Sequence, residues 1–261
     1  MTTQGGPRID PALADRVTEA VLLAGLPVGY GGYGAGVQLR PARPYDDSDD
    51  CAGLIALHWE PGPRLAAAAA MEQSQQPASA ARRVVSSSMQ NALAEFLPAF
   101  GIEVSAGRPD GETRVRPTGG PAPAPITVAG RDASAPVGSR PQDLGIRADV
   151  VGAVRRTAAL AGLPVADHQH APGITLAPCQ AVEDGDDSTG VADLRWNPSR
   201  RLSAADDERA VRARTAVQDA MRHAFGAVLG ACGLDLQWRR PATLPYQLRA
   251  YGLAEHPPVR P

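Results

Sequence analysis

The sequence predicts an α+β protein built from two tandem, homologous two-layer units. A shift of 137 residues places residues 23–28 (Leu-Ala-Gly-Leu-Pro-Val) on residues 160–165, which have the same sequence. A motif, Trp-x-Pro-x-x-Arg-Leu, begins at Trp59 and again at Trp196. Segments with helical and with strand periodicity also follow each other in the same order in both copies. A small unit leaves faces and edges uncovered, so we expect the two copies to dock as an intramolecular pseudo-dimer.

Each copy is predicted to open with a helix that is followed by two strands. In the first copy Asp10 is a suitable N-cap, Pro11 suits the first helical position, and Gly25 ends the helix. Gly162 ends the corresponding helix of the second copy. Alternating apolar residues then predict the strands. These are residues 37–39 and 55–59 in the first copy, and residues 174–176 and 192–196 in the second.

A long amphipathic helix comes next in each copy, and its apolar stripe is the clearest helical signal in the chain. The stripe consists of Val85, Met89, Leu93, Phe96 and Phe100 in the first copy, matched by Val217, Met221, Phe225, Val228 and Cys232 in the second. Ser203 and Asp206 resemble a capping box at the start of the second long helix. Residues 66–80, a surplus of the first copy, either extend its long helix or form a loop.

Two more strands complete each unit, so the predicted order is helix, strand, strand, helix, strand, strand. The long helices end at Gly101 and Gly233. The strands are predicted at residues 102–104 and 113–116, and at residues 234–238 and 246–250. Pro, Gly, Ala and Ser dominate residues 118–142, which predicts an extended linker. The units are therefore placed at residues 1–117 and 143–261.

Composition excludes several classes of protein. The formal net charge of −2 gives no overall basic signal for nucleic acid or anionic membrane, and the basic residues are all Arg. The start of the chain lacks the apolar stretch of a signal peptide, and no apolar run has the length of a membrane span, so we expect a cytoplasmic protein with no membrane contact. The three Cys are unmatched between the copies and indicate isolated thiols, not a disulfide frame or zinc site.

Three local patterns resemble parts of ligand sites, and each also has a simpler structural explanation. The acidic loops at residues 46–50 and 183–187 have carboxylates for a cation, but solvated hairpin turns also favour Asp. The Gly-rich residues 29–36 lead from a helix into a strand, the reverse of a phosphate-binding loop. His168 and His170 form half a metal site at best. We therefore predict no cofactor and no metal.

The candidate partner-binding residues are those that both copies retain. Trp59 and Trp196 suit a core position at the end of a strand, and the prolines that follow them end that strand. Arg64 and Arg201, in the same motif, either pair with an acidic loop or contact a partner. The candidates are Trp59, Trp196, Arg64 and Arg201, together with Arg82 and Arg214, which precede the stripes of the long helices and either snorkel past the sheet edge or line a groove.

The favoured function is a non-catalytic binding or adaptor protein that meets another protein through a composite surface between its two units. Motifs for nucleophilic, zincin and nucleoside triphosphate chemistry are missing from the sequence, which makes an enzyme the less favoured class. One alternative is nucleic-acid binding through an Arg patch of the second unit. This patch would contain Arg200, Arg201, Arg239, Arg240 and Arg249. The other is an enzyme or small-ligand binder with its site at the inter-unit cleft, where His58, Asp193 and Arg195 would converge.

Overall fold

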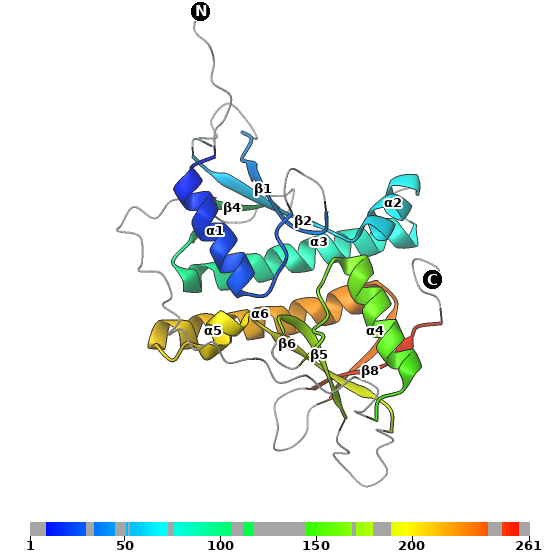
Figure 1. Ribbon diagram of the computed structural model, residues 1–261. Coiled ribbons are helices and arrows are strands. Elements are labelled where there is room, and N and C mark those ends of the chain that lie inside the picture. Colours follow the sequence, from blue (N-terminus) through cyan, green and yellow to red (C-terminus); the bar gives the residue numbers. More distant parts are fainter. Residues whose placement is uncertain are drawn as a thin grey trace, which may run out of the picture.

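The structure is a computed structural model of the chain, and it contains two α+β units of the same design (Figure 1). It describes residues 9–29, 34–44, 51, 53–72, 76–105, 112–116, 145–168, 171–179, 189–239 and 247–255. The acidic loops, residues 30–33 of the Gly-rich segment, His170 and the whole linker lie outside the described residues. The predictions that concern those segments, and the unit boundaries at 117 and 143, stay predictions.

The first unit runs in the predicted order, with two short helical elements added. It comprises α1 (Pro11–Leu23), β1 (Gly36–Pro41), β2 (Ile55–Glu60), α2 (Pro63–Met71), α3 (Pro77–Phe96), the 3-10 helix η1 (Leu97–Phe100), β3 (Glu103–Ser105) and β4 (Thr113–Arg116). The second unit comprises α4 (Ala148–Ala161), β5 (Gly173–Pro178), β6 (Ala192–Asn197), α5 (Arg200–Ala204), α6 (Glu208–Ala231), β7 (Leu234–Arg239) and β8 (Gln247–Leu253).

The two sheets have the same topology, which confirms the duplication at the level of the fold. Both are antiparallel and four-stranded, with the orders β1-β2-β4-β3 and β5-β6-β8-β7. The last strand of each unit therefore lies inside its sheet, and the strand before it lies at the edge. Trp59 and Trp196 are buried, as are Met89 and Met221, in agreement with the predicted core positions.

The helix ends follow the local sequence signals. The Asp10 carboxylate accepts a hydrogen bond from the Ala12 amide at the start of α1, and Pro11 is the first helical residue. Gly25 and Gly162 follow α1 and α4 with φ angles of 82° and 79°, a left-handed conformation that a side chain would strain.

Two details at the start of the long helices differ from the sequence prediction. Residues 66–80 divide between two helices. The helix α2 ends at Met71, and α3 begins at Pro77, so the last of these residues do extend the long helix. The predicted capping box at Ser203 and Asp206 is wrong. The N-cap of α6 is Asp207, which accepts from the Ala210 amide, while Ser203 belongs to the separate helix α5. In both units an unpredicted short helix, α2 or α5, begins within the tryptophan motif and precedes the long helix.

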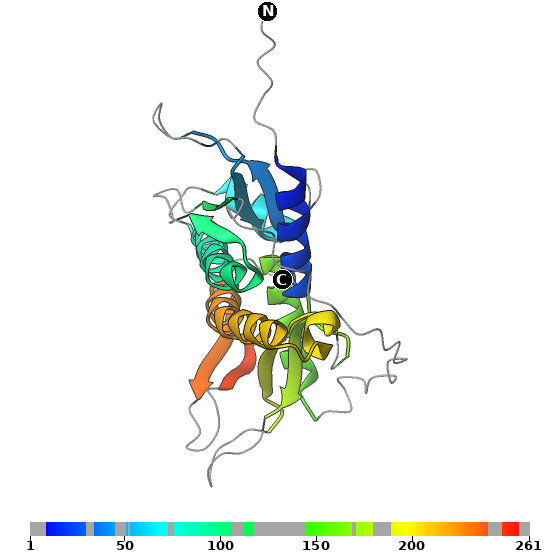
Figure 2. The same ribbon diagram turned by 90° about the vertical axis from the view of Figure 1, so that its left-hand side faces the viewer.

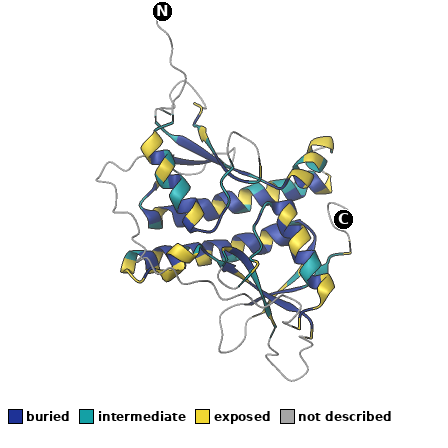
Figure 3. Ribbon diagram, viewed as in Figure 1, coloured by how far each residue is buried: buried dark blue, intermediate teal, exposed yellow. Residues whose placement is uncertain are grey.

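The long helices α3 and α6 pack side by side in the middle of the molecule. The two views place the first sheet on one side of this helix pair and the second sheet on the other (Figures 1 and 2). The buried residues of α3 and α6 and the inward faces of both sheets form one apolar core, and exposed residues lie on the outer helix faces (Figure 3). Burial of this apolar surface is the main favourable term in the fold.

Candidate functional site

The tryptophans of the repeated motif join one unit to the other. The Trp59 indole Nε1 donates a hydrogen bond of 2.9 Å to the carbonyl oxygen of Ala161, at the end of α4. The Trp196 indole Nε1 donates a bond of the same length to the carbonyl oxygen of Ala24, directly after α1. These two bonds are equivalent under the 137-residue shift, as in an isologous two-fold contact.

A second pair of main-chain bonds repeats the same relation. The Gly62 amide donates to the Leu160 carbonyl, and the Ser199 amide donates to the Leu23 carbonyl, both at 2.9 Å. The glycine that follows each of these helix ends has no room for a side chain. A Cβ on Gly162 would lie 2.7 Å from Cβ of Ala35 in the first unit. The two sequences that the copies share most closely therefore contact each other across the seam between the units.

This seam explains why both motifs recur in the two copies. An indole N–H that is buried must find an acceptor, and the last carbonyls of a helix lack a partner within that helix. The indole N–H of each unit donates to a helix-end carbonyl of the other unit. A change in either partner alone would leave a buried polar group unpaired. Trp59 and Trp196 are 0% and 4% exposed, so their indole rings contribute to the seam and not to an open surface.

The motif arginines lie near the seam but are not equivalent. Arg201 of α5 forms a 3.2 Å ion pair with Glu19 of α1, so this partner comes from a helix of the other unit. The residue that matches Glu19 in the second unit is Arg156, and Arg64 therefore faces a different charge pattern. Both side chains of the Arg201–Glu19 pair are largely exposed, which limits its contribution to stability.

The arginines before the helical stripes also take different partners. Arg82 lies 3.6 Å from the Glu60 carboxylate, and the same carboxylate lies 3.6 Å from Nε2 of His58. Arg214 instead donates to the Ser203 carbonyl at 2.9 Å. Arg82 thus forms a small charged cluster with β2, whereas Arg214 holds the end of α5 against α6.

The proposed convergence of His58, Asp193 and Arg195 at an inter-unit cleft is wrong. His58 belongs to β2 and the other two residues belong to β6, and these strands lie in different sheets on opposite sides of the α3 and α6 pair (Figure 1). In the sequence repeat, position 58 matches position 195, so the same face of each strand carries them. The cause is that the equivalent strands β2 and β6 belong to separate sheets on opposite sides of the helix pair.

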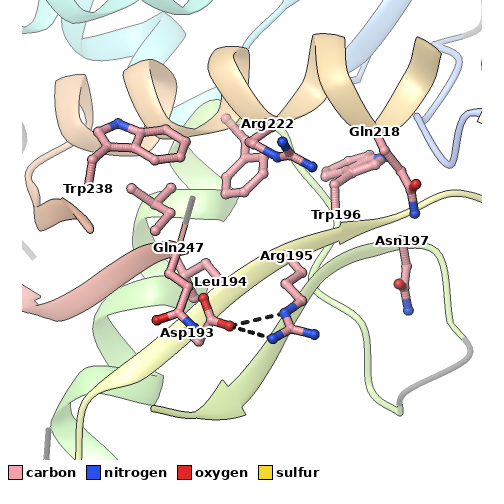
Figure 4. Close-up of a pocket in the computed structure, with 11 residues that line it drawn as sticks. Asp193, Leu194, Arg195, Trp196, Asn197, Gln218, Arg222, Trp238 and Gln247 are labelled. Atoms are coloured by element: carbon pink, nitrogen blue, oxygen red, sulfur yellow. Dashed lines mark hydrogen bonds and ion pairs between the residues drawn. The ribbon is translucent and has the colours of Figure 1, made fainter. Parts of the chain in front are cut away.

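A pocket of about 500 Å³ lies between α6 and the second sheet (Figure 4). Its lining combines apolar rings with amide and charged groups. The lining residues are Asp193, Leu194, Arg195, Trp196 and Asn197 of β6, Gln218, Arg222 and Phe225 of α6, Trp238 of β7, and Gln247 and Leu248 of β8. Strand β6 pairs with β8 only as far as Leu194, so the pocket lies where these two strands separate.

One wall of the pocket depends on a glycine in the middle of α6. A Cβ on Gly226 would lie 2.9 Å from the six-membered ring of Trp238 and 3.3 Å from a methyl carbon of Leu248. Glycine lowers helix stability by about 1 kcal/mol relative to alanine, so the position favours close ring contact over helix propensity. Trp238 remains 44% exposed, and it is one of the few large apolar side chains of the described residues that is. The repeat partner of Gly226 is Ala94.

The charged groups of the pocket differ in how firmly they are held. Arg195 donates to the Asp193 carboxylate through Nε at 3.0 Å and Nη2 at 2.8 Å. Arg222 lies 3.7 Å from the Asp219 carboxylate, beyond normal hydrogen-bond length. The Oε1 atom of Gln247 is buried and has no hydrogen-bond donor among the described residues. A ligand with an anionic group for Arg222 and an N–H group for Gln247 would complete these interactions.

The corresponding positions of the first unit carry different residues. Gln90, which matches Arg222, is only 7% exposed, and its main-chain carbonyl accepts a hydrogen bond of 3.2 Å from the Thr113 hydroxyl of β4. This bond joins the last strand directly to the long helix. In the second unit Leu248 occupies the position of Thr113 by strand register, and no hydroxyl is available there.

The sequence did not predict that each sheet has a buried arginine on its outer face. Arg114 of β4 and Arg249 of β8 occupy the same register position and are 4% and 0% exposed. Arg114 donates to the Arg43 carbonyl at 2.6 Å and to Sγ of Cys51 at 3.3 Å, so it holds the two ends of the first hairpin loop. Their match needs a shift of 135 residues, which a comparison at constant offset misses. Burial also removes Arg249 from the suggested surface Arg patch.

Two groups of the described residues, His58 of β2 and Cys232 after α6, have pKa values shifted by burial. Burial lowers the pKa of His58, an effect that the nearby Glu60 carboxylate opposes. Burial raises the pKa of the Cys232 thiol to about 12, which makes this group a poor nucleophile near neutral pH. No three His, Cys, Asp or Glu side chains gather as metal ligands within the part of the chain that the structure describes.

Among the described helices, none combines the length and the apolar character needed to cross a membrane. Comparison of the chain with protein-family models, with curated proteins and with solved structures finds no match. Function is therefore inferred from the chain's own residues.

Proposed function

We propose that this chain is a binding protein whose second unit carries the ligand site, in the pocket between α6 and the sheet. The observation that carries the proposal is the paired change of Gly226 and Trp238, which opens a wall for an indole ring at a cost in helix propensity. A Trp that is half-exposed beside a polar cavity adds little to the packing of the core. Such a cavity is the usual architecture of a small-ligand or side-chain site.

The chemistry of the lining supports a planar apolar group that carries a negative charge. Trp196, Phe225 and Trp238 offer ring faces and edges. The two arginines of the lining exceed its single aspartate, and Arg222 has the weaker existing partner. The Gln247 amide adds an acceptor for a donor group of the ligand. An aromatic carboxylate, or an aromatic side chain next to an acidic one in a protein partner, has all three features.

The site differs from the composite surface that the sequence favours. Of the residues that suggested such a surface, Trp59, Trp196 and Arg201 make contacts between the units. The seam therefore supports a scaffold role for the first unit, which holds α6 against α3 and fixes the roof of the pocket. We also propose a cytoplasmic location and a protein partner.

The test is binding of anilinonaphthalene sulfonate, an anionic aromatic dye, followed by its fluorescence. We expect the intact protein to bind the dye and Arg222→Gln to weaken binding about tenfold, equivalent to about 1.4 kcal/mol. Trp238→Ala should weaken it by a similar factor. The matched control is Arg212→Gln, which removes the same charge from the same helix at an exposed i, i+4 pair outside the pocket.

Circular dichroism and thermal unfolding would show that each variant keeps its fold. Equal dye affinity in the Arg222→Gln variant and the Arg212→Gln control would contradict the proposed site. Dye binding that rises as the protein unfolds would indicate exposed core, and would also count against it.

A further inference from the structure

Strand β7 offers an unpaired edge with an unusual sequence. It is the last strand in the order of the second sheet, and β8 is its only partner among the described strands. Its residues after Leu234 are intermediate or exposed, and they include the half-exposed Trp238. Natural sheets usually protect such an edge with a bulge, a short strand or inward-pointing charge, because its free N–H and C=O groups recruit another strand.

The one irregularity of this ladder lies on the other strand. Asp235 pairs with Gly252 and Leu236 pairs with Ala250, so the extra residue, Tyr251, belongs to β8. Strand β7 itself is regular over its six residues. The matching edge strand of the first unit, β3, spans only the three residues Glu103–Ser105. The free edge of the second sheet thus presents six residues, with the extra residue of the ladder on the other strand.

Pairing of β7 with β7 of a second copy is restricted by symmetry. Two antiparallel edge strands of identical chains are related by a two-fold axis perpendicular to the sheet, so residues directly opposite each other must lie on the same face. Side chains alternate between faces, and the axis must therefore pass beside a residue and not between two residues. Within the centre of β7 this leaves axes at Leu236, Gln237 or Trp238.

Only the axis at Gln237 pairs opposite charges. It places Asp235 opposite Arg239 of the second copy, and Leu236 opposite its Trp238, with each pair formed twice. The axis at Leu236 would place Asp235 opposite Gln237, and the axis at Trp238 would place Gln237 opposite Arg239. Within the described residues neither Asp235 nor Arg239 has an ion pair, so both are free to form one between copies.

We propose that two copies of this chain associate through β7, with Gln237 at the two-fold axis, to form one continuous antiparallel sheet from the two second units. Four β7 side chains of each copy form the cross-strand pairs, of which two are ionic and two are apolar. The interface is small, so the dimer is weak, with a dissociation constant in the micromolar range. The proposal does not depend on the ligand pocket, because it rests on the edge strand alone.

The experiment is sedimentation velocity of the full chain over a range of concentrations. We expect a reversible monomer–dimer equilibrium. Asp235→Arg places Arg opposite Arg, and Arg239→Asp places Asp opposite Asp, so each change should weaken the dimer at least about tenfold. The double variant Asp235→Arg with Arg239→Asp restores both pairs with exchanged signs, and should recover the dimer.

A matched change excludes an effect of net charge alone. Glu208→Arg alters the charge of the chain as much as Asp235→Arg, but at an exposed position of α6. It should leave the dimer unchanged. A chain that stays monomeric at every concentration would overturn the proposal. A dimer that either single variant leaves intact, or that the double variant fails to recover, would overturn it as well.

Discussion

The two units share one topology, but they treat the space beneath their long helices differently. In the first unit the Thr113 hydroxyl binds the Gln90 carbonyl, and the last strand is drawn against α3. In the second unit Leu248 and Arg222 replace these residues, Gly226 replaces Ala94, and a pocket lined by Trp238 remains. The tryptophan motif and the Leu-Ala-Gly-Leu-Pro-Val sequence at the seam are the same in both copies, whereas the positions of Arg222, Gly226 and Leu248 differ between them.

This difference separates two kinds of position: those that join the units and those that line the proposed ligand site. The seam needs both copies of each motif, since the indole of one unit binds the helix end of the other. The proposed ligand site uses residues of the second unit alone. Each of the following predictions either breaks this comparison or makes it sharper.

The largest effect is expected from the seam tryptophans. Trp59→Ala and Trp196→Ala should each lower the free energy of unfolding by about 3–5 kcal/mol, because each removes a buried ring and leaves a helix-end carbonyl unpaired. Trp238→Ala, at a half-exposed position, should cost about 1 kcal/mol. Urea unfolding measures all three. A large difference between the first two variants would refute their equivalence.

The same seam predicts what happens when the linker is cut. Limited trypsin cleavage near Arg131 or Arg140 should leave the two halves associated on a sizing column, as expected for an interface well above about 1,000 Å². The halves of the Trp59→Ala protein should separate more readily after the same cut. Free separation of the unmodified halves would remove the pseudo-dimer interpretation.

A smaller loss is expected at the glycines after α1 and α4. Gly25→Ala and Gly162→Ala should each cost about 2 kcal/mol or more, because the new Cβ meets atoms of the other unit in addition to the strained φ. Gly53→Ala is the control, since its φ is 74° but no atom lies within 4 Å of the added Cβ. Thermal unfolding should show Gly53→Ala to be the milder change. Equal losses at all three positions would mean that the seam contributes nothing there.

Exchange of the α3 and α6 residues tests the pocket with a matched pair. Ala94→Gly should destabilise the protein by about 1 kcal/mol through helix propensity alone. Gly226→Ala gains the same term, but displaces the Trp238 ring, so its net effect on stability should be close to zero. The tryptophan emission of Gly226→Ala should shift to longer wavelength and its dye binding should fall. Unchanged emission and dye binding would show that Gly226 does not set the pocket wall.

The smallest effect concerns His58, which has no histidine counterpart in the second unit. Its pKa in the folded protein is lowered from 6.5, mainly by burial, so the unfolded chain binds a proton that the folded chain releases. Stability is therefore highest above pH 6.5 and falls as the pH drops through the lowered value. His58→Gln should flatten this part of the pH profile of the melting temperature.

Much of the fold follows from local signals that the sequence states directly. The Asp10 cap, the left-handed Gly25 and Gly162, and the apolar stripes of α3 and α6 depend on contacts within a few residues of each other. The short helix α5 escaped prediction because its five residues carry too little periodicity. The buried Arg114 and Arg249 escaped because strand register, not sequence offset, makes them equivalent.

The sequence by itself determined that there are two units, the order of their elements and the residues of their cores, because helix and strand periods repeat along the chain. Only the tertiary structure decided what the retained motifs do. The Trp59 indole and the Ala161 carbonyl are 102 residues apart, and nothing local indicates that one binds the other. The pocket depends in the same way on Gly226 and Trp238, whose contact exists only after β7 packs beneath α6. Hydrogen bonds and packing between distant residues are set by the assembled core, and that information is spread over the whole chain.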